Sequence, residues 1–564
     1  MDKKINQHDR APSSKRRTLL KGLGLAPLLP LLPACQLGAP TEQALDYPNR
    51  LSFISPINRM LGNFDQTIFT GDDFTRPHQM LWQKSSYLKR IGGLPKPKRK
   101  AELVIIGGGM SGLMTAYLTR TKNPVILEQA PRFGGNAKAE AWQGLHYALG
   151  AAYLVKPEPG SVLFKLFKDL GISKDCAIKA GGDGDVVING RRIENFWAAT
   201  SEPGYKAVYK KLHDYFMSFI EENGALFPDY PTDDAKLRHY INTLDREDFK
   251  SHLEKNIGAT LPPHLATLLE HYCYSSFGGS STELSAAAGI NFFAAEFGDI
   301  AVFPGGNAYI AEALLKQLHR QLPERHLLPG SLVFDVRMQQ NDVLISYLDA
   351  NHQAQSLLAE RVVMACPKFV AAKLIDDLPA EKLAAIKALE YRAYLVANLL
   401  VNRPIKETDY DIYWLGPGNA DLKQVAAYAQ SRGITDIINA NFSSPDTQKS
   451  VLSFYQAFPY RGGRTELFTE NANMDMKSRI SAQLKQEIYP FYGLTEHDVA
   501  ALRLTRWGHP LPLAAVGLLD SGIVDKLRAP LAQRIYFVEQ DNWALPAVET
   551  VAAEAGYWSS VIQS

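Results

Sequence analysis

A glycine-rich turn constrains the fold of this 564-residue chain more than any other stretch. The β-branched run AELVIIGGG ends in glycines, and MSGLMTAYLTRT follows it with apolar residues at helical spacing. NPVILEQ then has the composition of a second short strand. A strand, a glycine turn, a helix and a strand within about 30 residues predict a βαβ unit, and such a unit belongs to a parallel sheet.

The glycines of the turn have the spacing G-x-G-x-x-G at Gly107, Gly109 and Gly112. In this spacing the first glycine permits a tight turn, the second lets the backbone approach a pyrophosphate, and the third lets the helix pack close to the strand. The free N–H groups at the start of the helix also favour phosphate. The flanking strand and helix supply the context of a dinucleotide site, and no Gly-Lys-Ser/Thr sequence follows that would indicate a Walker-type loop.

A second motif begins at Glu128, which ends the second predicted strand. A carboxylate at this distance from the glycines can accept hydrogen bonds from both ribose hydroxyls of an adenosine. The alternative is a solvated acid at a strand end, and the upstream glycines favour the ribose. Arg132 can lie along the dinucleotide with its fixed charge, and the doublet Gly134-Gly135 lets the chain pass close beneath a cofactor.

G-x-G-x-x-G followed by E-x-x-x-R-x-G-G resembles the FAD signature of the flavin-containing amine oxidase superfamily, which includes amine oxidases, protoporphyrinogen oxidases and carotenoid desaturases. The resemblance is specific over residues 103–153 and looser over FPGGNAYIAEAL, the run ending in VVMACP, and the C-terminal IYFVEQD and PAVETVAAEAG. It implies FAD as cofactor and an α/β fold, in which a discontinuous Rossmann-like FAD-binding domain carries an inserted α+β substrate domain.

The resemblance also implies roles for single residues. It places Gly107, Gly109, Ser111 and Gly112 at the pyrophosphate, Glu128 at the adenosine ribose, and Arg132, Gly134 and Gly135 along the phosphates and ribityl chain. It places Gly150 and Ala151 beside the isoalloxazine and Val333 at the adenine. Asp541 matches the end of the last strand, and Val548 matches the start of the last helix. Two departures, Asn136 where the family commonly has arginine and VEQD where it has AGE, indicate a divergent branch.

The pattern along the chain predicts the domain boundaries. We assign the FAD-binding domain to residues 101–170, 300–370 and 500–564, and the substrate domain to 171–299 and 371–499. Residues 36–100 show no clear periodic element and are expected to form a lead-in to the first strand. Because the three remaining cysteines beyond Cys35 are far apart and lack CxxC spacing, we expect neither a metal site nor a disulfide framework.

Catalysis in such an enzyme belongs to the flavin, while the protein orients the substrate. Trp507 and Trp543 are candidates for an aromatic wall at the flavin, and His509 is a candidate polar neighbour. The alternative for the tryptophans is core packing, and for the histidine an ordinary core or surface role.

The sequence therefore predicts an FAD-dependent oxidoreductase that removes a hydride from a C–N or C–C bond of a small organic substrate, with amines among the candidates. The electrons would pass to oxygen or to a respiratory acceptor. A polyene desaturase or isomerase is an alternative, because no acidic, amine-attracting cluster is visible in the sequence. A non-catalytic FAD-binding protein is a second alternative. An NAD-dependent dehydrogenase is disfavoured, since no second nucleotide motif is found.

The N-terminus predicts export. Arg16-Arg17 followed by TLLK resembles a twin-arginine signal, and LPAC resembles a lipobox ending at Cys35. Residues 1–35 are therefore expected to engage the twin-arginine machinery and to direct the protein to the periplasm, with Cys35 a candidate lipid anchor. The alternative is a basic tail with an apolar anchor. Beyond residue 35 the chain has 54 basic and 57 acidic residues, which gives no reason to expect nucleic-acid binding.

Overall fold

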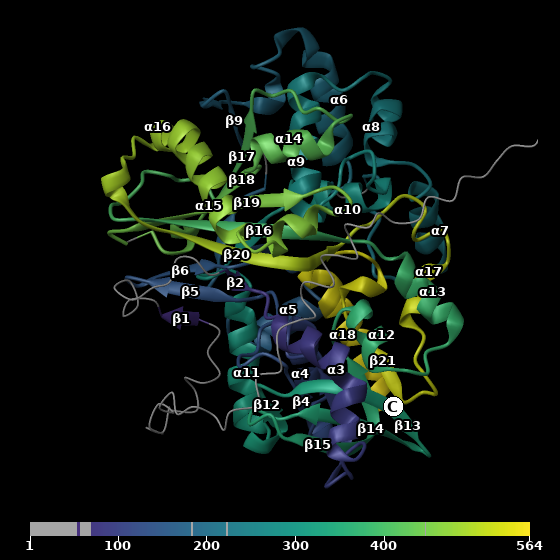
Figure 1. The fold of residues 1–564 in the computed structure, drawn as a ribbon. Helices are drawn as coiled ribbons and strands as arrows, with labels where there is room; N and C mark the ends of the chain where they lie inside the picture. Colours follow the sequence, from purple (N-terminus) through teal and green to yellow (C-terminus); the bar gives the residue numbers. More distant parts are fainter. Residues whose placement is uncertain (1–53, 57–68, 182–183, 222–223, 446) are drawn as a thin grey trace, which may run out of the picture. The chain divides into compact units, whose positions relative to one another are not determined.

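The computed structural model describes residues 54–56, 69–181, 184–221, 224–445 and 447–564 (Figure 1). The predicted export signal, with Arg16, Arg17 and Cys35, lies outside the described residues. Among the residues that are described, no helix combines the length and the apolar character needed to cross a membrane.

The predicted βαβ unit is present at the centre of a seven-stranded sheet. α4 (Met110–Leu118) connects β3 (Lys100–Ile106) to the parallel strand β4 (Val125–Leu127). Two later segments complete this sheet, because β15 (Ala354–Met364) pairs parallel to β3 and β21 (Ile535–Phe537) pairs parallel to β15. The remaining strands are β12 (Leu327–Leu328), β13 (Leu332–Gln339) and β14 (Asp342–Leu348). The sheet is thus assembled from distant parts of the sequence, as a discontinuous Rossmann-like domain requires (Figure 1).

Helices cover the seven-stranded sheet. α4 packs against α11 (Ala308–Gln321) and against the last helix, α18 (Val548–Gln563), which in turn contacts α5 (Val162–Leu170). α4 is buried around almost its whole circumference, and Leu113, Met114 and Ala116 are fully enclosed. This explains why its sequence is apolar on every side rather than amphipathic.

An eight-stranded sheet forms the second centre of the fold, with strands in the order β10 (Arg191–Ile193), β9 (Asp185–Ile188), β17 (Asp411–Gly416), β18 (Asp436–Asn439), β19 (Ser450–Phe458), β16 (Tyr391–Val401), β20 (Val499–Pro512) and β2 (Thr70–Gly71). Residues 500–512, assigned from sequence to the FAD-binding domain, and residues 70–71, assigned to the lead-in, both pair within this sheet. One face carries Leu395, Leu452 and Phe454 and packs with Met476 and Ile480 of α15 (Ala472–Gln483).

Helices also gather between residues 206 and 295. They are α6 (Lys206–Met217), α7 (Ala235–Leu244), α8 (Phe249–Ile257), α9 (Pro263–Phe277) and α10 (Ala286–Ala295). Their core is rich in aromatic rings, and Phe216 contacts both Phe293 and Phe297. α9 also contacts β17 and β19, so it covers the face of the eight-stranded sheet opposite to α15.

Smaller elements connect these parts. They are two three-stranded sheets, made of β1 (Ile54–Pro56), β5 (Ala139–Trp142) and β6 (Leu145–Ala148), and of β7 (Tyr153–Val155), β11 (Ile300–Val302) and β8 (Ala177–Lys179), together with the helices α12 (Lys368–Leu374), α13 (Ala380–Ala388), α14 (Val425–Arg432), α16 (Tyr489–Tyr492) and α17 (Ile523–Arg528).

The expectation that residues 36–100 hold no periodic element is wrong for residues 75–91, which form α3 (Thr75–Ile91). Met80 of this helix is buried against Phe334 and Leu348 of the seven-stranded sheet. Lys84 follows one turn later on the same face and forms an ion pair with the buried Asp335 at 2.9 Å. A lysine inside the buried stripe interrupts the apolar pattern, and this hid the helix from the sequence analysis.

Candidate functional site

The three motif glycines lie where side chains have no room. A Cβ atom on Gly107 would overlap the carbonyl oxygen of Ala365, which directly follows the neighbouring strand β15, and Gly107 has φ +112°, which favours glycine. A Cβ atom on Gly112 would overlap the carbonyl oxygen of Gly107. The first glycine thus allows the turn and the third allows α4 to touch the turn, as the spacing implied.

The glycine doublet closes onto the second motif glycine. Gly134 N donates to Gly108 O at 2.8 Å, and Gly109 and Gly134 form a parallel bridge. A Cβ atom on Gly135 would come within 2.9 Å of the Cα of Gly109. The structure therefore brings the two motifs into contact at the start of α4. Because Gly109 is the N-cap and no side chain caps this helix, the helix start offers N–H groups to a phosphate.

Two of the predicted residues flank this helix start. Ser111, in the first turn of α4, is buried, and its hydroxyl donates to the carbonyl oxygen of Val538 just after β21. Arg132 is half-buried in the loop between Glu128 and the doublet.

Glu128 is buried, and backbone groups fix its carboxylate. Gly108 N donates to one carboxylate oxygen at 2.7 Å, and Ala130 N donates to the other at 2.8 Å. Burial raises the pKa of Glu128, and these two bonds oppose the shift. Each oxygen keeps a lone pair for a ribose hydroxyl. Ser331 N donates to Glu128 O at 2.7 Å, so the loop leading to Val333 lies against Glu128. The predicted ribose and adenine positions are thus neighbours.

Lys138 is a candidate that the sequence analysis missed. It lies three residues beyond the doublet, and its Nζ is 5.6 Å from the centre of the Trp507 ring. Burial lowers the pKa of Lys138, while the nearby carboxylates of Glu128 and Asp72 oppose the shift. The sequence signal for Lys138 was its position close to Asn136, which replaces the arginine that is common in the family.

The predicted isoalloxazine stretch lies between the two large sheets. Gly150 O accepts a hydrogen bond from the Tyr455 hydroxyl at 3.0 Å, and Ala151 O accepts one from Asn307 N at 3.1 Å. The indole N–H of Trp507 donates to Leu149 O at 2.7 Å. The structure therefore brings Trp507 and Gly150 together.

Trp543 lies elsewhere. Its indole N–H donates to Glu554 of α18 at 2.9 Å, and its ring packs against Tyr230 in the aromatic helical core. Trp507 belongs to a different hydrophobic cluster, so the two tryptophans do not form one wall. Core packing accounts for the contacts of Trp543.

His509, Asp541 and Val548 lie around the last strand. His509 packs against the ring of Phe369, with 4.5 Å between ring centres, and against Tyr391. Burial lowers the pKa of His509 to about 3, so it is neutral at physiological pH. Tyr391 donates to Asp541, which also accepts a hydrogen bond from the backbone N–H of Lys368 at 2.9 Å. His509 and Asp541 are thus joined through Tyr391.

The start of α18 faces the same region as the start of α4. Val548 is its first residue, and no side chain caps it. Glu549 accepts a hydrogen bond from Val155 N of β7 at 2.8 Å, which holds the helix start near Gly150 and Ala151. Two uncapped helix starts, a glycine cradle and a buried acid fit a dinucleotide cofactor.

One face of the eight-stranded sheet is buried although it is polar. Cross-strand partners share a face, and Asp436 pairs with both Tyr413 and Tyr455, while Tyr394 pairs with Trp507. Asp411 lies two residues before Tyr413 and therefore on that face too. This polar face, formed by Asp411, Tyr413, Asp436, Tyr455, Tyr394 and Trp507, looks toward Gly150 rather than toward α15.

Two buried polar atoms in this region, Oδ1 of Asp411 and the hydroxyl of Tyr410, have no hydrogen-bond partner among the described residues. Asp436 is better satisfied, since Ser275 of α9 donates to it at 2.8 Å and Thr435 at 2.7 Å. Burial raises the pKa of Asp411 well above its ordinary range, and the neighbouring Asp436 adds to the shift. Buried polar atoms in proteins are almost always paired, so the polar face can accept donors from a ligand.

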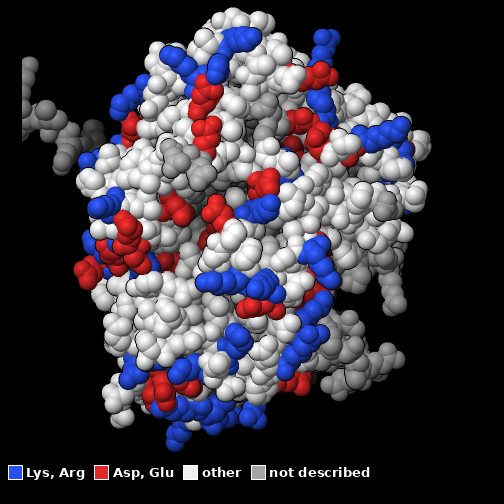
Figure 2. All heavy atoms as spheres, turned by 180° about the vertical axis from the view of Figure 1, so that it is seen from behind, with Lys and Arg blue, Asp and Glu red and all other residues white. Residues whose placement is uncertain are grey.

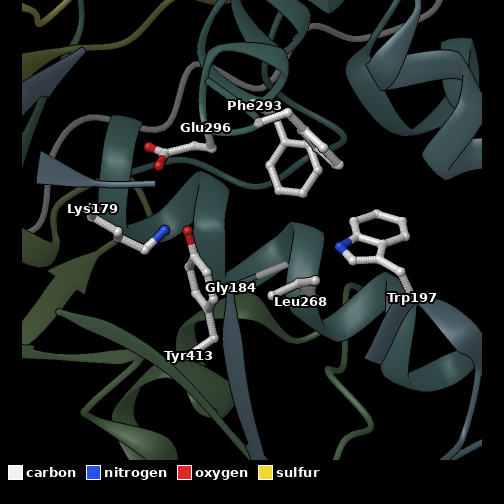
Figure 3. Close-up of a pocket in the computed structure, with 8 residues that line it drawn as sticks. Lys179, Gly184, Trp197, Leu268, Phe293, Glu296 and Tyr413 are labelled. Atoms are coloured by element: carbon white, nitrogen blue, oxygen red, sulfur yellow. The ribbon is translucent and has the colours of Figure 1, made fainter. Parts of the chain in front are cut away.

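A third acid, the half-buried Glu296, lies beside this face. Glu296 accepts hydrogen bonds from Tyr153 at 2.9 Å and from Tyr272 at 3.4 Å, and burial raises its pKa. In Figure 3 its carboxylate, the ammonium of Lys179 and the hydroxyl of Tyr413 lie around one pocket. The pocket is lined by Lys179, Gly184, Trp197, Leu268, Phe293, Glu296, Phe297 and Tyr413.

The sequence analysis found no acidic cluster, because Asp411, Asp436 and Glu296 come from separate segments. Each of the two strand acids stands alone in an otherwise apolar or aromatic strand. That pattern, a lone carboxylate within a buried strand, was the available signal.

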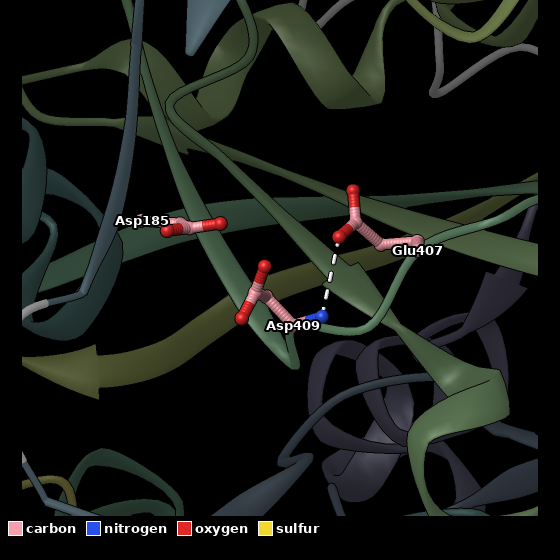
Figure 4. Close-up of side chains that lie close together, drawn as sticks. All are labelled: Asp185, Glu407 and Asp409. Carbon is pink, nitrogen blue, oxygen red and sulfur yellow. Dashed lines mark hydrogen bonds between the residues drawn. The ribbon is translucent and has the colours of Figure 1, made fainter. Parts of the chain in front are cut away.

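A further acidic group, Asp185, Glu407 and Asp409, lies at the edge of the same sheet (Figure 4). Arg192 forms ion pairs with all three carboxylates, at 2.6 Å to Glu407 and 2.7 Å to Asp409. This arginine offsets part of the negative charge of the group and ties the β9–β10 hairpin to the segment before β17. On the face in Figure 2, basic and acidic side chains are largely interspersed, in agreement with the near-neutral composition.

Comparisons with known proteins agree with this geometry. The family described as flavin containing amine oxidoreductase matches residues 110–538. The chain is 22% identical over 504 residues to the oxidoreductase PigB of a Serratia species, which covers 80% of this chain and 73% of that protein. A putrescine oxidase solved with putrescine has a TM-score of 0.60 at 14% identity, over 82% of this chain and 99% of that one. A fatty acid isomerase from P. acnes has a TM-score of 0.59 at 13% identity, over 82% and 98%.

Proposed function

We propose, from the premise that this chain belongs to the flavin containing amine oxidoreductase family, that it oxidises a cationic amine bound at the polar face. Family membership makes it an FAD-dependent oxidoreductase. Bound FAD supplies the two-electron acceptor. The glycine turn and the start of α4 would hold its pyrophosphate, Glu128 its ribose, and the start of α18 its flavin end.

The observation that carries the proposal is the pair of buried carboxylates on the polar face, with Oδ1 of Asp411 unpaired. A buried carboxylate is stabilised by a cationic partner, and an ammonium supplies both charge and N–H donors. The same face carries the rings of Tyr394, Tyr413 and Tyr455, and aromatic rings attract cations.

The raised pKa of Asp411 also suits proton transfer. An amine must lose its extra proton before the C–N unit can give up a hydride, and a carboxylate with a raised pKa can accept that proton. In the proposed reaction Oδ1 of Asp411 takes the proton, and the C–N bond becomes an imine that water can hydrolyse. The two electrons pass on to oxygen or a respiratory acceptor.

An apolar polyene fits this face less well, because it would leave Oδ1 of Asp411 without a donor. The similarity to a fatty acid isomerase is one of fold alone. A non-catalytic role gives no reason for the unpaired Oδ1 of the buried Asp411.

The flavin spectrum of the purified protein, followed anaerobically, tests the proposal. Titration with putrescine or a longer polyamine is expected to bleach the visible flavin band, whereas an unsaturated fatty acid should leave it oxidised. Bleaching by the fatty acid alone would favour the desaturase or isomerase alternative. A flavin that dithionite reduces but that no amine of a broad panel reduces would contradict amine oxidation.

We also propose that the protein is exported through the twin-arginine pathway to the periplasm, with a lipid on Cys35 as its anchor. The basic and apolar order of residues 1–35 supports this. Replacing Arg16-Arg17 by Lys-Lys should hold the protein in the cytoplasm, as cell fractionation would report. Replacing Lys3-Lys4 by Arg-Arg is the matched control and should not alter export. Equal periplasmic amounts of the Lys-Lys variant and the wild type would refute the pathway.

A further inference from the structure

The segment Phe69–Arg76, called the strap below, was expected to be part of an irregular lead-in, yet it joins the two ends of the cofactor site. At its first end Thr70 and Gly71 pair with Thr505 and Arg506 of β20. Asp72 continues this contact, because its N–H donates to Arg506 O at 3.0 Å and its carboxylate accepts the N–H of Gly508. These contacts flank Trp507, which is bonded to the predicted isoalloxazine stretch.

Arg76 makes the contacts at the other end. Its guanidinium donates to Gln129 O at 3.2 Å and to Gly330 O at 2.7 Å. The side chain of Gln129 returns a hydrogen bond to Asp73 O at 3.3 Å. Gln129 directly follows Glu128, and Gly330 directly precedes Ser331, whose N–H bonds Glu128. Arg76 thus bridges the two loops that carry the predicted ribose and adenine contacts.

The geometry points to a structural reason for using arginine here. The two carbonyl groups belong to loops about 200 residues apart in sequence, and the planar fork of a guanidinium can hold both at fixed spacing. A lysine ammonium is a point charge and cannot impose that spacing in the same way. Aromatic packing anchors the strap between its ends, since Arg506 lies over the rings of Phe69, Phe74 and Phe468.

We propose that the strap is a third wall of the FAD site and that Arg76 is a positioning residue for the adenosine end of the cofactor. The proposal rests on FAD binding by this chain and is independent of the substrate. The role proposed for Arg76 concerns the affinity for FAD. It can therefore fail while amine oxidation holds, and amine oxidation can fail while it holds. The strap supplies the edge strand β2 of the eight-stranded sheet and belongs to neither nucleotide motif.

The test uses the Arg76→Gln variant, with Arg90→Gln as control, since Arg90 lies on the same helix and contacts the ring of Tyr87 on the exposed side. The apoprotein of each variant is titrated with FAD, ADP and riboflavin. For Arg76→Gln we expect the Kd for FAD and for ADP to rise by about tenfold or more, as loss of a charged positioning contact implies. The Kd for riboflavin and the Tm of the apoprotein should match those of the control.

Arg76→Lys keeps the charge and guards against a folding defect, and we expect it to bind FAD more weakly than wild type but more tightly than Arg76→Gln. An unchanged Kd for FAD in both Arg76 variants would overturn the proposal. A lower Tm of the apoprotein with unchanged Kd would also overturn it, because Arg76 would then serve only folding. An equal rise in the Kd for riboflavin and for ADP would contradict the assignment of Arg76 to the adenosine end.

Discussion

Replacing Gly135 by alanine is expected to give a protein that purifies without flavin. Gly135 has φ +60°, and its new Cβ would come within 2.9 Å of the Gly109 Cα at the start of α4. The doublet and the glycine turn would be forced apart where the backbone approaches the pyrophosphate. Because a shift of 1 Å at a phosphate cradle removes several hydrogen bonds, we expect the Kd for FAD to rise by about a hundredfold or more.

Gly144→Ala is the matched control for this prediction. Gly144 also has a left-handed backbone, with φ +84°, but nothing lies within 4 Å of its Cβ position. Both variants therefore carry a similar backbone cost of about 1–2 kcal/mol, and only Gly135→Ala adds the collision. The ratio of visible flavin absorbance to ultraviolet protein absorbance compares their flavin content. Full flavin occupancy in Gly135→Ala would show that the doublet does not touch the cofactor.

Replacing Asp411 by asparagine is expected to abolish amine turnover without loss of stability. The variant keeps the shape of the side chain but removes the charge and the proton acceptor, and kcat/KM should fall by about a hundredfold or more. The folded protein holds a proton on the Asp411–Asp436 pair more tightly than the unfolded chain does, because burial raises both pKa values, that of Asp436 to about 7. This tighter proton binding adds to the free energy of unfolding at acid pH, and the added free energy is lost as the pH rises toward and through 7.

The variant should therefore unfold at an equal or higher Tm than wild type at pH 8, while losing activity. Asp377→Asn is the control, because Asp377 is exposed and is far in sequence from Asp411 and Asp436. Thermal melts over a pH series and steady-state kinetics with a diamine measure both effects. A variant with normal kcat/KM would remove Asp411 from the reaction, and a much lower Tm at pH 8 would make Asp411 a structural residue.

The cofactor side of the site could be predicted from sequence because its signals are local. The glycine turn, α4 and Glu128 follow one another within one βαβ unit, and each residue type is dictated by backbone geometry. Even so, the partners of Glu128 were not predictable in detail, since Ser331 approaches it from a loop two hundred residues away.

The substrate side escaped sequence analysis because its residues meet only through sheet pairing. Asp411 and Asp436 share a face through the register of β17 and β18, and register is not legible from either strand alone. Trp543 illustrates the converse: its position near a motif makes it a site candidate, and its contacts are with Glu554 and Tyr230 in the aromatic helical core. For Asp411 and Asp436, position in the sequence alone does not reveal proximity in space.

The interleaving of the two large sheets has a consequence for synthesis of the protein. Thr70 bonds Thr505, 435 residues later, and β3 shares its sheet with β21 near the C-terminus. Neither sheet can close until almost the whole chain has left the ribosome, and contacts of such long range slow folding. The nascent chain must therefore spend most of its translation time without a complete flavin cradle, and cofactor capture becomes one of the last events of its maturation.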